Sequence, residues 1–412
     1  MSDELRIMIA AGGTGGHVFP AIAIADAIRS AHPSSRFLFV GTRDRMEWKT
    51  VPAAGYDIAP IWISGLHRRL TLKNLLFPLK LVVSLLQSRK LIRRFRPHAI
   101  ISCGGFVAGP AGWMASRMGV PLFLQEQNSY PGVTNRKLAP KAQRIFTAFD
   151  EASGWFPKQK IILAGNPVRN KMITRLRDPG FPAKARRHFK LDDERPVLLV
   201  MGGSGGAKSI NDAMLKHLKA LHDSDGIQII WQCGETYLGQ IREKLNESAT
   251  PVADFPGLRL YGFMDDITEA WAAADVIVAR AGAITCSELL AAGKAGILVP
   301  SPWVAGDHQT HNAKSLADNG AAVLLKDGDL DAQLPEAIRK LINDPPLREK
   351  MQEQARNMAK NDAATVIAGK ILDHLEKSGA TPAIPTDSDK KQSSNLKHDN
   401  NKTHNTFSST SA

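Results

Sequence analysis

The sequence predicts an α/β fold with two Rossmann-like domains, because one pattern of elements occurs in it twice. Near the start, an apolar strand over residues 5–11 leads into a glycine-rich segment at 12–17, a helix over 21–31 and a second strand over 37–41. The order of strand, glycine loop and helix returns 190 residues later, after a strand at Val197–Met201. A chain of 412 residues is long enough for two such domains.

Each half continues with further strand and helix segments, as a parallel sheet requires. In the second half, a glycine loop at 202–206 precedes a helix over 207–221 and a strand over 227–232. Apolar runs of strand length, separated by helical spacing, predict one more strand–helix–strand unit in each half. These units are 99–103, 107–118 and 121–125 in the first half, and 275–279, 285–292 and 296–300 in the second.

Composition marks the expected domain boundaries. We expect the first domain over residues 1–166, a linker rich in proline and charge over 167–195, and the second domain over 196–360. Residues 378–412 are dominated by Ser, Thr, Asn and Lys and contain few large apolar side chains. Such a segment cannot bury enough surface to order itself, so a disordered tail is expected.

The charge balance favours an anionic partner. Lys and Arg number 53 against 40 Asp and Glu, a net charge of +13, which suits nucleic acid, a phosphate-bearing substrate or an acidic membrane surface. The three cysteines have no C-x-x-C spacing, which argues against a disulfide scaffold and favours a cytosolic location. The first residues lack the basic segment of a signal peptide, and no run of 18 apolar residues predicts a spanning helix.

Glycine loops between a strand and a helix let backbone N–H groups approach a phosphate at the helix N-terminus. Two such loops predict a ligand with a diphosphate, or two phosphate ligands; tight turns without a ligand are the alternative. Neither loop is a complete dinucleotide fingerprint, since Val18 and Lys208 stand where the third glycine belongs. Gly104 and Gly105, after the strand 99–103, make a third glycine turn at the same expected edge.

Polar side chains at the carboxyl ends of predicted strands are candidate site residues. His17 follows the first strand, and its imidazole can take a proton from a hydroxyl near neutral pH or can simply cap and pack. Glu126, Gln127 and Asn128 follow another strand and face either ligand or solvent. Glu288, one turn inside a helix, either accepts two sugar hydroxyls or caps that helix.

Two sequence patterns are typical of metal sites, but neither predicts one here. His308 and His311 are three residues apart but lack a third ligand at suitable spacing, so we expect them in a solvated loop. The D-x-D matches at 327–331 and 387–389 fall in an expected loop and in the tail. The sequence therefore predicts no metal site.

The segment from Arg68 to Arg96 contains nine Lys or Arg residues and no acid. Within it, residues 75–86 are almost wholly apolar, but twelve residues are too few to span a bilayer. A basic rim around an apolar patch predicts a surface that lies on anionic lipid. A core helix with a charged outer face is the alternative.

These motifs together resemble those of the MurG-type N-acetylglucosaminyltransferases of bacterial cell-wall synthesis. The resemblance extends from about residue 5 to residue 376, nearly all of the chain except the tail. The motifs that carry it are residues 12–20, 64–66, 126–128, 165–169, 202–204, 206–207, 282–283, Thr285, 287–288, Gln309 and 312–313.

The resemblance implies a GT-B fold, in which two Rossmann-like domains face each other and a last helix, expected at 361–377, returns to the first domain. It implies inverting transfer of GlcNAc from UDP-GlcNAc to undecaprenyl-diphosphate-linked N-acetylmuramoyl-pentapeptide, the lipid I to lipid II step of peptidoglycan synthesis, with a β-1,4 product. No cofactor is implied. It also implies a peripheral protein on the cytoplasmic face of the inner membrane, working beside cell-wall synthesis and division proteins and not with nucleic acid.

The donor contacts of the family carry over to matching positions of this sequence. Among them, Glu288 resembles the ribose binder and Gln309 a contact to the sugar. The implied set is Thr14, Gly15, Gly16, Asn128, Arg169, Ser204, Met264, Ala283, Ile284, Thr285, Cys286, Ser287, Glu288 and Gln309.

For the acceptor side, His17 is the candidate base, with Glu126 in reserve. Two positions depart from the family pattern: Gly205 stands where Gln is usual, and Ala281 where Ser is common. Neither departure affects the phosphate binding that is expected at the helix N-termini. The acceptor diphosphate is implied to lie at Gly12, Gly13, Gly104 and Gly105.

Two other classes of protein remain as rivals on the sequence alone. A nucleotide-dependent dehydrogenase or ATPase would use the glycine loops differently, although the strand at 276–279 ends in Arg280 rather than in an acid for magnesium. A nucleic-acid-binding protein would explain the positive charge. The basic segment, however, contains only Phe77 and Phe95 as aromatic side chains for stacking on bases.

Overall fold

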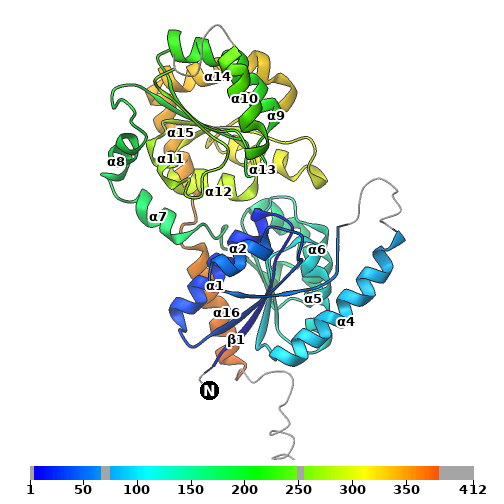
Figure 1. Cartoon of the computed structure of the whole chain (residues 1–412). Coiled ribbons are helices and arrows are strands. Elements are labelled where there is room, and N and C mark those ends of the chain that lie inside the picture. Colours follow the sequence, from blue (N-terminus) through cyan, green and yellow to red (C-terminus); the bar gives the residue numbers. More distant parts are fainter. Residues whose placement is uncertain (1–3, 66–74, 248–254, 380–412) are drawn as a thin grey trace, which may run out of the picture.

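The computed structural model describes residues 4–65, 75–247 and 255–379. In this part of the chain, the first half forms a seven-stranded parallel sheet in the order β3-β2-β1-β4-β5-β6-β7. The second half forms a six-stranded parallel sheet in the order β10-β9-β8-β11-β12-β13. Helices lie against both sheets, and the two domains are stacked one above the other (Figure 1). The predicted α/β fold with two Rossmann-like domains is confirmed.

The strands of the first domain are short apolar runs, because helices cover both faces of the sheet. Its fully buried strand residues include Ile7 and Ile9 on one face and Met8 and Ala10 on the other. The elements are β1 (Arg6–Ala10), α1 (Gly15–Ala31), β2 (Arg36–Gly41), α2 (Glu47–Ala53), β3 (Asp57–Pro60), α4 (Phe77–Phe95), β4 (Ala99–Ser102), α5 (Gly105–Arg117), β5 (Leu122–Glu126), α6 (Val133–Leu138), β6 (Arg144–Thr147) and β7 (Ile161–Leu163).

The second domain repeats this construction around its own core. Trp231 and Trp271, both fully buried, lie in different clusters on the two faces of the sheet. The elements are α7 (Asn170–Leu176), α8 (Phe181–His188), β8 (Val197–Met201), α9 (Lys208–Lys219), β9 (Gln228–Gln232), α10 (Glu235–Glu247), β10 (Leu258–Tyr261), α11 (Thr268–Ala273), β11 (Val276–Arg280), α12 (Ala283–Ala292), β12 (Ala295–Val299), α13 (His308–Asp318), β13 (Val323–Leu324), α14 (Leu330–Asn343), α15 (Pro345–Met358) and α16 (Ala363–Lys377).

The first helix begins six residues earlier than the sequence predicts. The carbonyl of Thr14 accepts hydrogen bonds from the N–H groups of His17, at 3.1 Å, and Val18, at 3.3 Å, so the helix starts at Gly15 rather than at residue 21. Pro20 then lies inside the helix and not before it. As a result, His17 lies in the first turn of α1 and not in the loop, on a rigid element.

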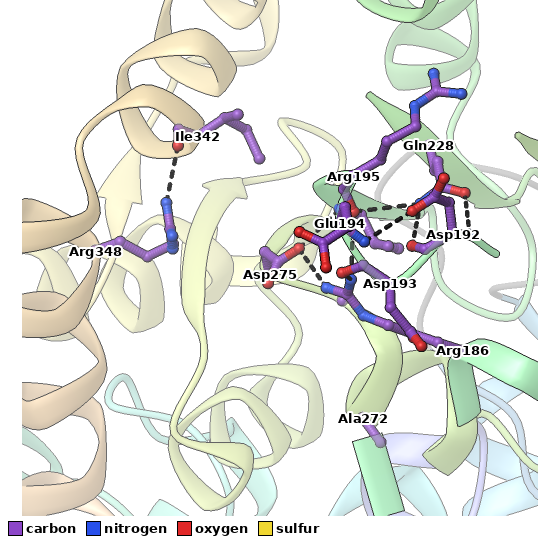
Figure 2. Close-up of polar contacts among 12 residues, drawn as sticks. Arg186, Asp192, Asp193, Glu194, Arg195, Gln228, Ala272, Asp275, Ile342 and Arg348 are labelled. Carbon is purple, nitrogen blue, oxygen red and sulfur yellow. Dashed lines mark hydrogen bonds and ion pairs between the residues drawn. The ribbon is translucent and has the colours of Figure 1, made fainter. Parts of the chain in front are cut away.

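The stretch expected to be a linker, residues 167–195, contains the helices α7 and α8. Phe181 and Ala185 of α8 are buried in the same core as Trp271 of the second domain. Polar contacts fix the end of this stretch, as Figure 2 shows: Arg186 donates to a carboxylate oxygen of Asp275 at 2.8 Å, and Gln228 donates to the carbonyl of Asp192 at 2.8 Å. These residues therefore pack as part of the second domain.

The chain crosses between the domains twice, and the two crossings touch. Gly165 has a left-handed φ of 87°, and a Cβ atom there would lie 2.3 Å from the Cβ of Lys360. After the second crossing, α16 lies beside α1 of the first domain (Figure 1). Its buried side chains, among them Ile367 and Ile371, join the core formed by β1 and α1. The tail expected from residue 378 lies outside the described residues beyond position 379.

Candidate active site where the domains meet

Helix N-termini gather at the point where the strand order reverses in each sheet, which is where α/β folds bind ligands. The order reverses between β1 and β4 in the first sheet and between β8 and β11 in the second. The helices that follow these strands are α1, α5, α9 and α12, and none of the four has an acidic residue in its first turn. The first turns of these helices therefore contribute no negative charge of their own, which suits an anionic ligand.

The glycine turns of the first domain lie directly against each other. Gly105 has a φ of 80°, and a Cβ atom there would lie 2.4 Å from the carbonyl oxygen of Gly12. Gly104 has a φ of 91°, and its Cβ would lie 3.0 Å from the ring of His17. Only glycine fits such a close approach. The structure thus brings Gly12, Gly104, Gly105 and His17 together, as the sequence predicts.

Glu47 hydrogen-bonds to this glycine loop through its side chain. The sequence analysis did not identify this residue. Its carboxylate is fully buried and accepts hydrogen bonds from the N–H of Gly13, at 3.1 Å, and from the N–H and hydroxyl of Thr42, at 3.1 and 2.9 Å. The N–H of Gly13 is therefore held by the protein itself. Glu47 follows β2 at the sheet edge, the same kind of position that singled out Glu126.

His17 is oriented by Gln127 in the tautomer that a general base needs. The Nδ1 atom of His17 lies 3.1 Å from Oε1 of Gln127, while Nε2 of Gln127 donates to the carbonyl of Cys103 at 2.5 Å. Because the amide oxygen faces the imidazole, Nδ1 carries the proton and Nε2 is left with a lone pair. Burial lowers the pKa of His17 below 6.5, although the hydrogen bond with Gln127 opposes this shift.

Glu126, the reserve candidate for the base, shapes its own loop. Its side chain is 1% exposed and accepts hydrogen bonds from the backbone and amide of Asn128, at 3.0 and 3.2 Å. It also accepts from the N–H of Gly132, at 3.1 Å, and from the amide of Asn135, at 2.9 Å. Burial raises the pKa of Glu126 and these donors lower it. These contacts are typical of a structural carboxylate.

In the second domain, a pocket of about 670 Å³ lies between the glycine loop after β8 and the start of α12. It collects three of the predicted donor residues, Ser204, Thr285 and Gln309, together with Gly205. The amide oxygen of Gln309 accepts a hydrogen bond from the N–H of Ser301 at 2.8 Å, which fixes the loop after β12. The pocket is lined by Gly202, Gly203, Ser204, Gly205, Gly206, Ala207, Lys208, Ser209, Asp212, Tyr237, Arg280, Gly282, Thr285, Ser301, Trp303, Gln309 and Asp327.

A polar triad on the wall of this pocket was not identified from the sequence. Asp327 accepts hydrogen bonds from the hydroxyl of Ser209, at 2.6 Å, and from the guanidinium of Arg280. Arg280 also donates to the oxygen of Ser209 at 2.7 Å. Asp327, which belongs to one of the D-x-D matches, is therefore engaged by Ser209 and Arg280. Its neighbour in the D-x-D pattern, Asp331, pairs with Lys216 at 2.6 Å on the surface.

Glu288 and Arg169 form an ion pair beside the first domain. The guanidinium of Arg169 lies 3.7 Å from Oε1 of Glu288 and 5.8 Å from the ring centroid of Phe19 in α1. Glu288 is buried, and desolvation raises its pKa to about 7, partly offset by the charge of Arg169. Neither residue lines the 670 Å³ pocket, so this pair lies outside that pocket.

Of the remaining predicted donor residues, Thr14, Gly15 and Gly16 lie at the start of α1 and Asn128 lies after β5, all in the first domain. The others lie along α12 and beside β9. Ala283 and Cys286 are buried, so they offer a ligand their backbone rather than their side chains. Ser287 accepts a hydrogen bond from the amide of Asn166 at 3.0 Å. The N–H of Met264 donates to the side chain of Gln232 at 3.0 Å, which fixes the loop after β10.

Direct contacts join the two site-bearing edges. Asn312 in α13 accepts hydrogen bonds from the backbone and hydroxyl of Ser129, both at 3.0 Å, and donates to Asn128 at 3.3 Å. His311 stacks on Tyr130 with ring centroids 5.3 Å apart. Burial is the main cause of the lowered pKa of His17, and an electrostatic interaction with His308 adds to it. The expectation of a solvated loop for the two histidines was therefore wrong, because both lie on α13 at the first domain.

Two further findings concern metals and membranes. Within residues 4–65, 75–247 and 255–379, no group of three or more His, Cys, Asp or Glu is placed to hold a metal ion. None of the helices in this part of the chain is long and apolar enough to cross a bilayer.

The fold and the site define a class of protein: a glycosyltransferase of the GT-B type, with two Rossmann-like domains that meet at the edges where their strands end. Residues 7–147 match the N-terminal domain of glycosyltransferase family 28, and residues 197–367 match its C-terminal domain. The chain belongs to the family of UDP-N-acetylglucosamine–N-acetylmuramyl-(pentapeptide) pyrophosphoryl-undecaprenol N-acetylglucosamine transferases, the MurG family.

Similar proteins and a solved structure support the assignment of the chain to this family. The chain is 44% identical to the transferase of that name from Salinibacter ruber over 367 residues, which cover 89% of this chain and 96% of the relative. It is 41% identical to that of Bacteroides fragilis over 371 residues, covering 90% and 96%. The crystal structure of Acinetobacter baumannii MurG is similar with a TM-score of 0.68 and 28% identity, covering 90% of this chain and 99% of that one.

A more distant likeness concerns the fold alone. The UDP-GlcNAc 2-epimerase of Neisseria meningitidis, solved with UDP-GlcNAc bound, has a TM-score of 0.63 at 13% identity, covering 90% of this chain and all of that one.

Proposed function

We propose that this chain transfers N-acetylglucosamine from UDP-GlcNAc to undecaprenyl-diphosphate-linked N-acetylmuramoyl-pentapeptide, forming a β-1,4 bond in peptidoglycan synthesis. One observation carries the proposal beyond family membership. Asn312 lies on α13, the helix that also carries Gln309 of the second-domain pocket, and hydrogen-bonds to Ser129 and Asn128 of the first domain. These two residues directly follow Gln127, which contacts His17. This connection between the two edges supports a mechanism in which His17 of the first domain takes a proton while the donor sugar is held by the second domain.

The two domains divide the substrates between them. In the proposal, the donor diphosphate lies at the N-termini of α9 and α12, with Ser204 and Thr285 near the phosphates and Glu288 on the ribose. The uracil lies near Met264, and the sugar lies near Gln309. The acceptor diphosphate lies at Gly12, Gly13, Gly104 and Gly105, with Thr14, Gly15, Gly16 and Asn128 between the two substrates.

The chemistry is a single displacement. The acceptor hydroxyl oxygen attacks the anomeric carbon, the bond from that carbon to the UDP oxygen breaks, and the hydroxyl proton passes to Nε2 of His17. Attack from the side opposite the leaving UDP inverts the α-linked donor to a β-linked product. The charge on the leaving diphosphate is stabilised by the two helix N-termini and by Arg169.

Incubation of the protein with radiolabelled UDP-GlcNAc and the lipid acceptor tests this proposal. We expect the label to appear in a lipid-linked product whose sugar is held by a β-1,4 bond. Label released only as free sugar would contradict the transfer, as would oxidation of a reduced nicotinamide cofactor or ATP turnover in its place.

Chelation provides a separate prediction. Because helix dipoles and Arg169 are proposed to stabilise the diphosphate, EDTA is expected to leave most of the transfer rate intact. The measurement is the initial rate in chelator, with and without magnesium added back in excess. A rate that collapses in EDTA and returns with magnesium would overturn the metal-free mechanism.

We further propose that the enzyme acts as a peripheral protein on the cytoplasmic face of the inner membrane, where cell-wall synthesis and division proteins also work. Support comes from α4, which lies along the outside of the first domain, on the far side from α16 (Figure 1). Leu79, Val82 and Leu86 on this helix are 53%, 56% and 59% exposed. The same helix carries five basic residues from position 80 to position 94, and positions 68–74 of the predicted segment lie outside the described residues.

Replacing Leu79, Val82 and Leu86 together by glutamine is expected to weaken binding to anionic vesicles by at least about tenfold, because each exposed apolar side chain gains from burial in lipid. Co-sedimentation with vesicles at rising salt measures this. Leu163→Gln, on a similarly exposed side chain in β7, is the matched control and should bind as the wild type does. Unchanged vesicle binding by the triple variant would refute the membrane surface.

A further inference from the structure

Trp303 is the most exposed large apolar side chain in the described part of the protein, at 85%. It lies in the loop after β12 and lines the 670 Å³ pocket of the second domain. An indole ring left in water gains free energy when a ligand covers it, so an exposed ring on a pocket wall marks a contact surface. The established reaction leaves this ring without a role.

The backbone of the loop that carries the ring is held in place. Pro300 and Pro302 restrict the backbone on both sides of Ser301. The N–H of Ser301 donates to the amide oxygen of Gln309 at 2.8 Å, and the N–H of Trp303 donates to the hydroxyl of Ser301 at 3.4 Å. Gln309, which is proposed to touch the sugar, is therefore hydrogen-bonded to the same loop that carries Trp303.

The pocket also indicates which part of the donor the ring meets. Its lining includes the glycine loop and the start of α12, where the diphosphate is proposed to lie, but not Glu288 or Met264, which are proposed for the ribose and the uracil. The ring therefore lies on the sugar side of the phosphates. Gly205 lines the same pocket without a side chain of its own, and a Cβ atom there would meet nothing within 4 Å.

We infer that Trp303 stacks on the apolar face of the GlcNAc residue of bound UDP-GlcNAc and distinguishes the nucleotide sugar from UDP. The inference rests on the proposed function. Aromatic faces contact the C–H groups of a sugar ring without hydrogen bonds, so the contribution depends on the ring and not on its N–H.

Calorimetric titration of the full-length protein with UDP and, separately, with UDP-GlcNAc tests this inference. Trp303→Ala is expected to raise the Kd for UDP-GlcNAc about tenfold and the Kd for UDP less than about twofold. Trp303→Phe, which keeps an aromatic face, should recover most of the affinity for UDP-GlcNAc. Since the side chain is almost fully exposed, neither change should disturb folding.

Intrinsic fluorescence gives a second readout. UDP-GlcNAc should change the emission of the wild type and of Trp113→Phe, whose indole lies on α5 and is 37% exposed, but not that of Trp303→Phe. Equal losses of affinity for UDP and UDP-GlcNAc in Trp303→Ala, or no loss for either, would overturn the inference while leaving the proposed function intact. A wild-type protein that binds neither compound would overturn the proposed function itself.

Discussion

Replacing His17 by alanine is expected to lower kcat by about 10²–10⁴-fold while the KM for UDP-GlcNAc changes little. The imidazole is proposed to take the proton only as the new bond forms, so its loss affects the transition state and not the binding of the donor. Steady-state kinetics with both substrates varied measure this. His188→Ala, at an exposed histidine remote from the site, is the control and should keep the wild-type kcat.

The pH dependence separates a base from a binding residue at this position. His17 must be neutral to accept a proton, and burial lowers its pKa below 6.5. The kcat of the wild type should therefore hold through neutral pH and fall as the pH drops through that lowered pKa. The alanine variant should lack this fall. A variant with near-normal kcat and a much larger acceptor KM would instead make His17 an acceptor-binding residue.

Replacing Glu288 by glutamine is expected to raise the KM for UDP-GlcNAc by about 10–100-fold and to change kcat much less. A buried carboxylate that accepts hydrogen bonds from two ribose hydroxyls contributes about 1.5–3 kcal/mol through each bond to the charge, and the amide keeps only part of this. The ribose is remote from the reacting carbon, so the loss falls on donor binding. Steady-state kinetics with UDP-GlcNAc varied at saturating acceptor measure it.

The pKa of Glu288, raised to about 7, gives this prediction a second test. Below that pH the carboxyl is protonated and accepts hydrogen bonds poorly, so the wild-type donor KM should rise as the pH falls through 7. In Glu288→Gln the donor KM should not depend on pH there. Glu336→Gln, at an exposed acid on α14, is the control. A lower melting temperature with unchanged donor KM would make Glu288 only a structural partner of Arg169.

Apolar runs made the central strands of both sheets predictable to within one or two residues, because strands covered on both faces need continuous hydrophobic sequence. The strands β3, β6, β7, β10 and β13 lie toward the edges of the two sheets and were not predicted. The helices were harder to predict where the helix preference of the local sequence and the tertiary packing disagree. Glycine and Pro20 disfavour a helix over residues 15–20, yet α1 begins there at the sheet edge. The helices α7 and α8 are short, and their buried residues such as Phe181 find apolar partners about 90 positions away, near Trp271. No local pattern contains that information.

Candidate site residues could be predicted where they lie in or beside a glycine turn, because such a turn can be recognised in the sequence. Glycine turns at strand ends and a polar residue beside them indicated His17 and the second-domain loop. Contacts across the fold were not predictable in this way. Glu47 reaches Gly13 from a different helix, Asp327 meets Arg280 across 47 positions, and His308 approaches His17 from the other domain. Each of these requires three-dimensional proximity that spacing along the chain does not encode.

The return of α16 to the first domain determines the order in which a newly made chain can complete its folding on the ribosome. The second domain is closed by α15, which ends at Met358, so all of its core residues leave the ribosome before α16 does. The first domain emerges earlier, but the apolar surface around Ile24 and Ile28 stays uncovered until Ile367 and Ile371 arrive. The half of the molecule that is translated first is therefore the half that is finished last.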